Sequence, residues 1–156
     1  MAVVKYVIGH WTAGNYIPCG TDKKSYQMLI DGNGAVYNCK PVGAAASCGG
    51  MNSITYNISC CGGLDRTPLK KVQCEKFFVE CAKALKKYHL PVSRFYTHAE
   101  IGQMCKTGTI KDLLPNNRYL SQNIGKVDLT KLPYDLGNKK HGDFIRNKIQ
   151  WYMERI

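Results

Sequence analysis

The chain has 156 residues, of which 44% are hydrophobic and 21% are charged. This length predicts one compact domain over residues 1–156, and no apolar run approaches the roughly 20 residues that cross a bilayer. The formal net charge of +11 predicts an anionic partner, such as nucleic acid, a membrane surface or an acidic cell-wall polymer. The composition therefore excludes a membrane-spanning protein and predicts a basic, soluble domain.

The N-terminal segment predicts the compartment of the chain and, with it, the state of the cysteines. Residues 1–8 are too short and too interrupted for a secretory signal, so we expect the chain to be made and first kept in the cytoplasm. Eight cysteines in a chain of this length, without an export signal, are expected to be mostly free thiols. No Cys-x-x-Cys pair is present, which argues against a structural zinc site.

The first elements in chain order are strands. Residues 3–8 predict a strand that leads into His10, and a loop follows to about Thr21. Residues 25–30 and 35–39 predict two strands of a hairpin, joined by the Asp-Gly-Asn-Gly turn at 31–34.

Helices enter in the second half. After a loop at 43–50, residues 53–61 form a β-branched run that predicts a strand. Thr67 and Pro68 offer a cap and a first helical residue for the longest helix, which stops before Pro91.

The remaining elements complete an α/β domain. Residues 92–96 predict a short strand, 102–139 read as mostly irregular, and a terminal helix begins near Gly142. Strands interleaved with one long and one terminal helix predict a central mixed β-sheet flanked by helices.

Three potential metal ligands stand at or near the ends of apolar stretches. His10, His98 and Asp128 can meet at one edge of a sheet if each lies at a strand exit, and two imidazoles with one carboxylate could hold Zn²⁺ with a position left for water. Lys126 lies two residues before Asp128 and can project to the same side of an extended loop. His141 is an alternative third ligand, but Asp128 is preferred because Lys126 is in register with it. The pattern predicts a hydrolase.

Six motifs occur in a family order over nearly the whole chain: His-Trp-Thr-Ala-Gly at 10–14, the hairpin at 25–34, the strand at 52–58, Gly62-Gly63, Thr-His-Ala-Glu at 97–100 and Gly-Lys-Val-Asp at 125–128. Together they resemble the zinc-dependent N-acetylmuramoyl-L-alanine amidases of the type-2 amidase and peptidoglycan-recognition family, especially phage endolysins. The resemblance implies that His10, His98 and Asp128 bind zinc and that Tyr26 and Lys126 are catalytic. Gln27 stands where relatives commonly carry histidine.

The resemblance also implies a reaction and a setting. The expected reaction is hydrolysis of the amide between N-acetylmuramic acid and the L-alanine of the peptidoglycan stem peptide, which lyses the cell wall. A lysin without a signal peptide would act from the host cytoplasm, after another protein such as a holin has disrupted the membrane. We expect a monomer.

Other functions remain open at this point. The first alternative is a non-catalytic peptidoglycan-binding protein of the same fold, and the second is a basic regulator that binds nucleic acid or a polymerase, such as the phage RNA polymerase. A cysteine hydrolase using Cys48 or Cys105 is a third. Glu100, two residues after His98, is expected to be a surface carboxylate, and the alternative is that it supports the metal ligands through a hydrogen bond.

Overall fold

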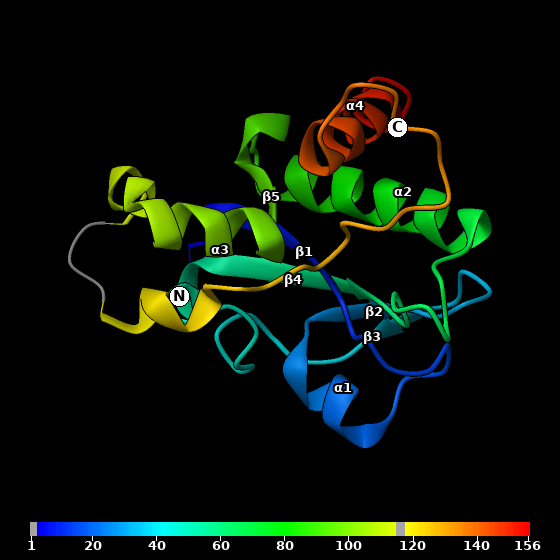
Figure 1. Ribbon diagram of the computed structural model, residues 1–156, viewed down its shortest axis with the longest axis horizontal. Helices are drawn as coiled ribbons and strands as arrows, with labels where there is room; N and C mark the ends of the chain where they lie inside the picture. The colour runs from blue at the N-terminus through cyan, green and yellow to red at the C-terminus, as the bar shows by residue number, and fades with distance from the viewer. Residues whose placement is uncertain (1–2, 115–117) are drawn as a thin grey trace.

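The computed structural model describes residues 3–114 and 118–156, and it contains a five-stranded sheet with helices on both faces (Figure 1). The strand order is β3-β2-β4-β1-β5. Strands β2 and β3 pair antiparallel as an edge hairpin, and the other neighbours pair in parallel. The strands are β1 (Tyr6–Trp11), β2 (Met28–Ile30), β3 (Val36–Asn38), β4 (Thr55–Cys60) and β5 (Phe95–Thr97). The predicted mixed sheet flanked by helices is confirmed.

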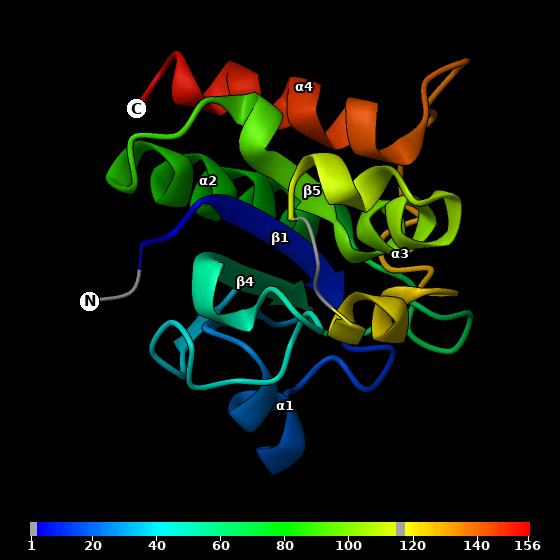
Figure 2. The same cartoon turned by 90° about the vertical axis from the view of Figure 1, so that its left-hand side faces the viewer.

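The helices form two layers. Helices α2 and α4 lie together over one face of the sheet, while α3 with η3 and η4 covers the other (Figure 2). The α-helices are α1 (Gly20–Ser25), α2 (Lys71–Lys87), α3 (His98–Thr107) and α4 (His141–Met153), and the 3-10 helices are η1 (Asn52–Ile54), η2 (Val92–Arg94), η3 (Thr109–Asp112) and η4 (Arg118–Asn123). Among the described residues, no helix combines the length and apolar character that a bilayer span needs.

Strand β1 lies inside the sheet and is buried along its whole length, as expected for a strand that is covered on both faces. Side chains alternate between faces, so Val7 and Trp11 join the core under α2 and α4. Tyr6 and Ile8 join the second core, under α3 and η4. His10 has the same parity as Tyr6 and Ile8, and this alternation places its imidazole on the α3 side.

Two α-helices, α1 and α3, were missed by the sequence prediction. Residues 20–25 form α1, where Asp22 accepts a hydrogen bond from the Cys19 N–H, so the predicted strand at 25–30 begins only at Met28. The predicted irregular segment 102–139 is wrong in part, because α3 extends to Thr107 and η3 and η4 follow. Residues 115–117 of that segment lie outside the described residues.

The start of α2 also differs from the prediction. Its N-cap is Lys70, whose backbone N–H donates to Gln73 Oε1, rather than Thr67. The Thr67 hydroxyl instead donates to the Gly14 carbonyl and ties the two loops together. The prediction of free thiols holds for all eight cysteines, and Cys60, Cys74 and Cys81 pack in the core under α2.

Candidate metal centre

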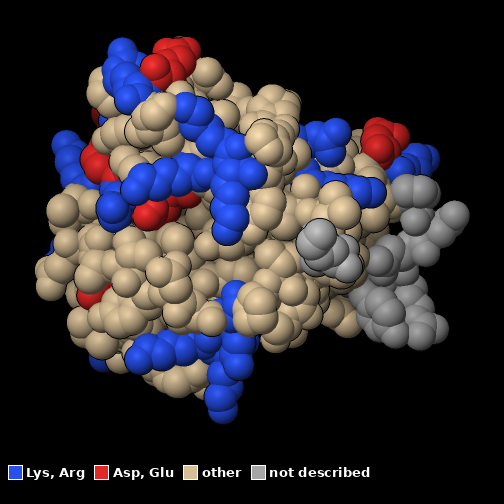
Figure 3. All heavy atoms as spheres, turned by 180° about the vertical axis from the view of Figure 1, so that it is seen from behind, with Lys and Arg blue, Asp and Glu red and all other residues tan. Residues whose placement is uncertain are grey.

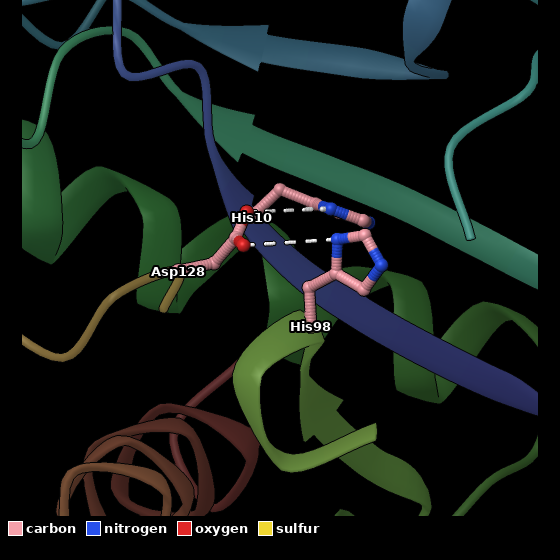
Figure 4. A group of neighbouring side chains, drawn as sticks. All are labelled: His10, His98 and Asp128. Atoms are coloured by element: carbon pink, nitrogen blue, oxygen red, sulfur yellow. Dashed lines mark ion pairs between the residues drawn. The ribbon is translucent and has the colours of Figure 1, made fainter. Parts of the chain in front are cut away.

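Three buried side chains converge beyond the carboxyl end of β1 (Figure 4). His10 is the penultimate residue of β1, His98 is the first residue of α3 directly after β5, and Asp128 lies in the loop after η4. Their side chains offer ligand atoms that all lie within 4.8 Å of one another. The Nδ1 atoms of His10 and His98 lie 3.7 Å from Asp128 Oδ2 and Oδ1, respectively. Parallel strands that end at one edge therefore bring together residues far apart in sequence.

The ring of His10 is oriented by a chain of amides behind it. Its Nε2 lies 2.8 Å from Asn57 Oδ1, and Asn57 Nδ2 donates to Gln27 Oε1 and to Thr55 Oγ1. Gln27 in turn donates through Nε2 to the Pro41 carbonyl. Since Asn57 uses its N–H groups on these acceptors, the atom that faces His10 is an acceptor. The Nε2 of His10 must then carry the proton, which leaves the lone pair of a neutral ring on Nδ1, toward Asp128.

The site favours a neutral His98 and an ionised Asp128. Burial, followed by the proximity of His10, lowers the pKa of His98 to about 4. Burial alone would raise the pKa of Asp128, but the attraction of either imidazole in its protonated form, together with the hydrogen bond from the Trp11 N–H, holds it below its usual range. A neutral imidazole and a carboxylate are the forms in which these side chains bind metals.

The donor set fits Zn²⁺. Two nitrogens and a carboxylate oxygen are zinc ligands, and donors on a tetrahedral ion at about 2.0–2.2 Å would stand roughly 3.4 Å apart. The two histidine–aspartate separations of 3.7 Å are close to this spacing. Ser59, the register partner of His10, has a buried hydroxyl that makes no hydrogen bond within the described residues. Three donors that converge without hydrogen bonds among themselves suit a bound ion better than a closed hydrogen-bond network.

A cleft of about 350 Å³ opens onto this centre. Tyr26 and Lys126, the two predicted catalytic residues, line it together with His98 and Asp128. The rings of Tyr26 and His10 lie 5.1 Å apart between centroids. Burial, followed by the charge of Asp128, raises the pKa of Tyr26 to about 12, so its phenol is a hydrogen-bond donor at neutral pH. Lys126 is exposed at the rim and brings a positive charge to the cleft.

The structure places the other candidates away from the three ligand atoms. The Nε2 of His141 lies 2.8 Å from Thr97 Oγ1, and its ring faces a neighbouring cavity. Glu100 caps α3 by accepting from the Thr97 N–H and forms a two-pronged ion pair with Arg146, so it fixes the helix that begins at His98. Thr97 completes this capping box through its own hydroxyl.

Neither of the two cysteines has the properties of a nucleophile. Burial raises the pKa of Cys48 to about 12 and also raises the pKa of Cys105. A nucleophilic thiol needs the opposite shift. The cysteine-hydrolase alternative is therefore disfavoured.

Sequence reasoning missed the amides that orient the histidines: Gln27, Asn57 and Asn123. One signal was present in the strand at 53–61, where every second residue, from Thr55 through Asn57 to Ser59, is polar, although the strand is buried. A polar stripe on one face of a buried strand indicates an internal hydrogen-bond network. Asn123 lies in a segment predicted to be irregular and had no such pattern.

Comparisons with known proteins give one family match and several structural matches. A family model described as Amidase_2: N-acetylmuramoyl-L-alanine amidase matches residues 1–110. A comparison with curated proteins gave no match.

Several solved structures share the fold. The amidase LysC from Clostridium intestinale URNW aligns with a TM-score of 0.56 at 16% identity, over 72% of this chain and 85% of that one. Staphylococcus aureus hydrolase AmiA, in complex with its ligand, aligns with a TM-score of 0.58 at 12% identity, over 97% of this chain and 74% of that one. The Ph2119 endolysin from Thermus scotoductus MAT2119 bacteriophage Ph2119 aligns with a TM-score of 0.53 at 16% identity, over 70% of this chain and 83% of that one.

Proposed function

Because this chain belongs to the N-acetylmuramoyl-L-alanine amidase family, we propose that it is a zinc-dependent peptidoglycan hydrolase. The bond cleaved is the amide between the lactyl group of N-acetylmuramic acid and the L-alanine of the stem peptide. The observation that carries the proposal is the convergence of His10, His98 and Asp128, with both Nδ1 atoms directed at one carboxylate. Asp128 lies beyond the matched residues 1–110, so its role rests on this geometry.

The residues of the centre have different roles in the hydrolysis of an amide. Zinc held by His10, His98 and Asp128 would polarise the scissile carbonyl and lower the pKa of a water molecule to about 7. Asp128 also contributes a negative charge that balances the cation. The buried position of both histidines excludes bulk water from the ligand atoms and strengthens their interaction with an ion.

Lys126 and Tyr26 are placed to act on the substrate. Lys126 brings a cation to the cleft rim, where it can offset the negative charge that develops on the carbonyl oxygen in the transition state. Tyr26 keeps its proton at neutral pH and can donate a hydrogen bond to that oxygen or to the attacking water. Both are assigned as catalytic because both line the cleft in which the reacting atoms would lie.

The charge of the protein suits a wall polymer. Lys and Arg side chains occur in several groups across the face in Figure 3, with fewer acidic ones between them. Peptidoglycan and its attached polymers carry carboxylates and phosphates, so a net charge of +11 would draw the enzyme to them in a salt-sensitive way. We assign the protein the role of an endolysin, in line with the Ph2119 neighbour.

Zinc content and cleavage test this function together. Purified protein is expected to bind about one zinc ion and to release stem peptide from muropeptide, with both properties lost in His10→Ala and zinc binding weakened in Asp128→Asn. The matched control is His141→Ala, which is expected to retain zinc because that ring contacts Thr97. Zinc binding by wild type without any cleavage would favour the non-catalytic peptidoglycan-binding protein instead.

A further inference from the structure

Asn123, at the end of η4, contacts both the ligand histidine His98 and the loop at 46–49. It is 1% exposed and lies outside the residues matched by the family model. Its Oδ1 lies 2.8 Å from His98 Nε2 and accepts a hydrogen bond from the Gly49 N–H at 3.0 Å. Its Nδ2 donates to the carbonyls of Gly49 and Leu120, at 2.8 and 3.0 Å. Every hydrogen-bonding atom of this amide is therefore in use.

These contacts determine which ring nitrogen of His98 carries the proton. Carbonyl oxygens only accept hydrogen bonds, so the side of Asn123 that faces Gly49 O and Leu120 O is the NH₂ group. The atom that faces His98 is then the oxygen, which requires a proton on His98 Nε2. The lone pair of the neutral ring is left on Nδ1, 3.7 Å from Asp128 Oδ1.

The same amide holds one wall of the cleft. Gly49 lies shortly after Ala46 and Ser47, which line the cleft together with Lys126. On its other side this loop is held by Asn52, whose Oδ1 accepts from the N–H groups of Ser47 and Cys48. Asn123 is thus the link between this loop and the histidine of the centre.

The backbone of Asn123 lies very close to helix α3. A Cβ atom added to Gly102 would lie 2.3 Å from the Asn123 carbonyl oxygen. Only glycine leaves room for the end of η4 at this position, one helical turn after His98. The backbone of Asn123 is therefore pressed against the helix that carries the ligand.

We propose that Asn123 is a positioning residue with two separable effects. Its oxygen fixes His98 with Nδ1 free for zinc, and its NH₂ group holds the loop at 46–49 in place for substrate. This inference rests on the proposed amidase function. A hydrogen-bonded partner of a metal-ligating histidine typically contributes a 10–100-fold effect on metal affinity.

Two substitutions at this position separate the effects. Asn123→Ala removes both, and zinc affinity, measured by competition with a chelating dye, is expected to fall by about 10–100-fold. Asn123→Asp keeps an acceptor for His98 but cannot donate to Gly49. Its zinc affinity is expected to stay within about threefold of wild type, while KM for a soluble muropeptide rises severalfold. The matched control is Gln122→Ala, an exposed neighbour on η4.

The possible results discriminate clearly. Wild-type zinc affinity in a folded Asn123→Ala, or an Asn123→Asp that loses zinc as strongly as the alanine variant, would overturn the inference. If Asn123→Ala does not fold, Asn123→Asp decides alone through its zinc affinity and KM. A wild-type protein that takes up no zinc defeats the proposed function and this inference together, whereas an active wild type with an unaffected Asn123→Ala defeats only the inference.

Discussion

The Nε2 atom of His10 lies 2.8 Å from Asn57 Oδ1, although in the register of the sheet Asn57 pairs with Ile8 and His10 pairs with Ser59. The imidazole therefore reaches toward the start of β4, to the residue two positions before its register partner Ser59. This tilt turns Nδ1 toward the carboxyl edge of the sheet, where Asp128 lies. Each ligand histidine is thus held from behind by an asparagine, one from a strand and the other from a 3-10 helix.

Loss of the Asn57 amide should weaken metal binding. Asn57→Ala removes the acceptor for His10 and leaves Gln27 Oε1 with one donor fewer, so we expect zinc affinity to fall by about 10–100-fold. Dye competition measures this affinity. Asn38→Ala, on the exposed edge strand, is the matched control. Unchanged zinc affinity in a folded Asn57→Ala would show that the ring of His10 is oriented by other contacts.

Lys126 should affect turnover rather than metal content. Lys126→Ala removes the cation from the cleft rim and is expected to lower kcat by about 10²–10³, the effect of losing one donor to a developing oxyanion. Zinc stoichiometry should stay at the wild-type value. Lys106→Ala, an exposed lysine of α3, should retain full kcat. Equal kcat values for the two variants would remove Lys126 from the mechanism.

Tyr26 should act through its phenolic proton. Tyr26→Phe keeps the ring against His10 but removes the donor, and we expect kcat to fall on the order of 10² with zinc affinity unchanged. Since the pKa of Tyr26 is raised to about 12, the wild-type rate should show no ionisation of this group between pH 6 and about 10. Steady-state kinetics across this range, with Tyr88→Phe as the control, provides the test. Full activity in Tyr26→Phe would contradict the assignment.

Gly102 should tolerate no side chain. Gly102→Ala places a methyl group 2.3 Å from the Asn123 carbonyl oxygen, so η4 must move or α3 must bend, at a cost of about 1–3 kcal/mol of unfolding free energy. Zinc affinity should fall together with the unfolding free energy, because Asn123 is displaced from His98. Urea unfolding and dye competition measure the two effects. Gly20→Ala, where a Cβ meets no atom within 4 Å, is expected to leave both unchanged.

The carboxylate of Glu75, between α2 and α4, should make the free energy of unfolding depend on pH. Glu75 of α2 accepts hydrogen bonds from Tyr134, Tyr152 and Lys148. Burial alone would raise the pKa of Glu75, but these donors hold it below the usual value of 4.5. The folded state then binds this proton less readily than the unfolded chain. The stabilisation is present above the unfolded pKa and is lost as the pH falls through the folded one.

The comparison of wild type with Glu75→Gln measures this contribution. The difference in unfolding free energy should be largest above pH 5, on the order of 0.5–1 kcal/mol because the pair is partly exposed, and should shrink toward pH 3. Urea titrations at several pH values report it. Glu154→Gln, at the exposed end of α4, is the control. A difference that stays constant with pH would mean that Glu75 has no shifted pKa.

The sheet could be predicted from sequence because its strands carry local signals. The β-branched run at 53–61 and the Asp-Gly-Asn-Gly turn specify pairing within a few residues, and His10 and His98 follow such runs. Helices α1 and α3 were missed, because each is defined by a capping contact, at Asp22 and at Glu100, rather than by a long apolar period.

The ligand set was easier to predict than the residues behind it. His10, His98 and Asp128 are residue types with few other buried roles, so their positions after strands were informative. Asn57 and Asn123 act through amide orientation, which depends on acceptors far away in the chain, Gln27 for Asn57 and Gly49 for Asn123. Asparagine in a sequence carries no mark of which acceptors will surround it.

The three ligand side chains come from the first strand, the start of α3 and the segment after η4, so a bound ion would act as a cross-link between three segments that are far apart in the sequence. Such a cross-link exists only in the native chain, and its contribution grows with the logarithm of free metal. The melting temperature of this protein should therefore be a function of zinc concentration. A chelator would loosen the segment between η4 and α4, which carries Asp128, and expose it to proteolysis before the sheet itself unfolds.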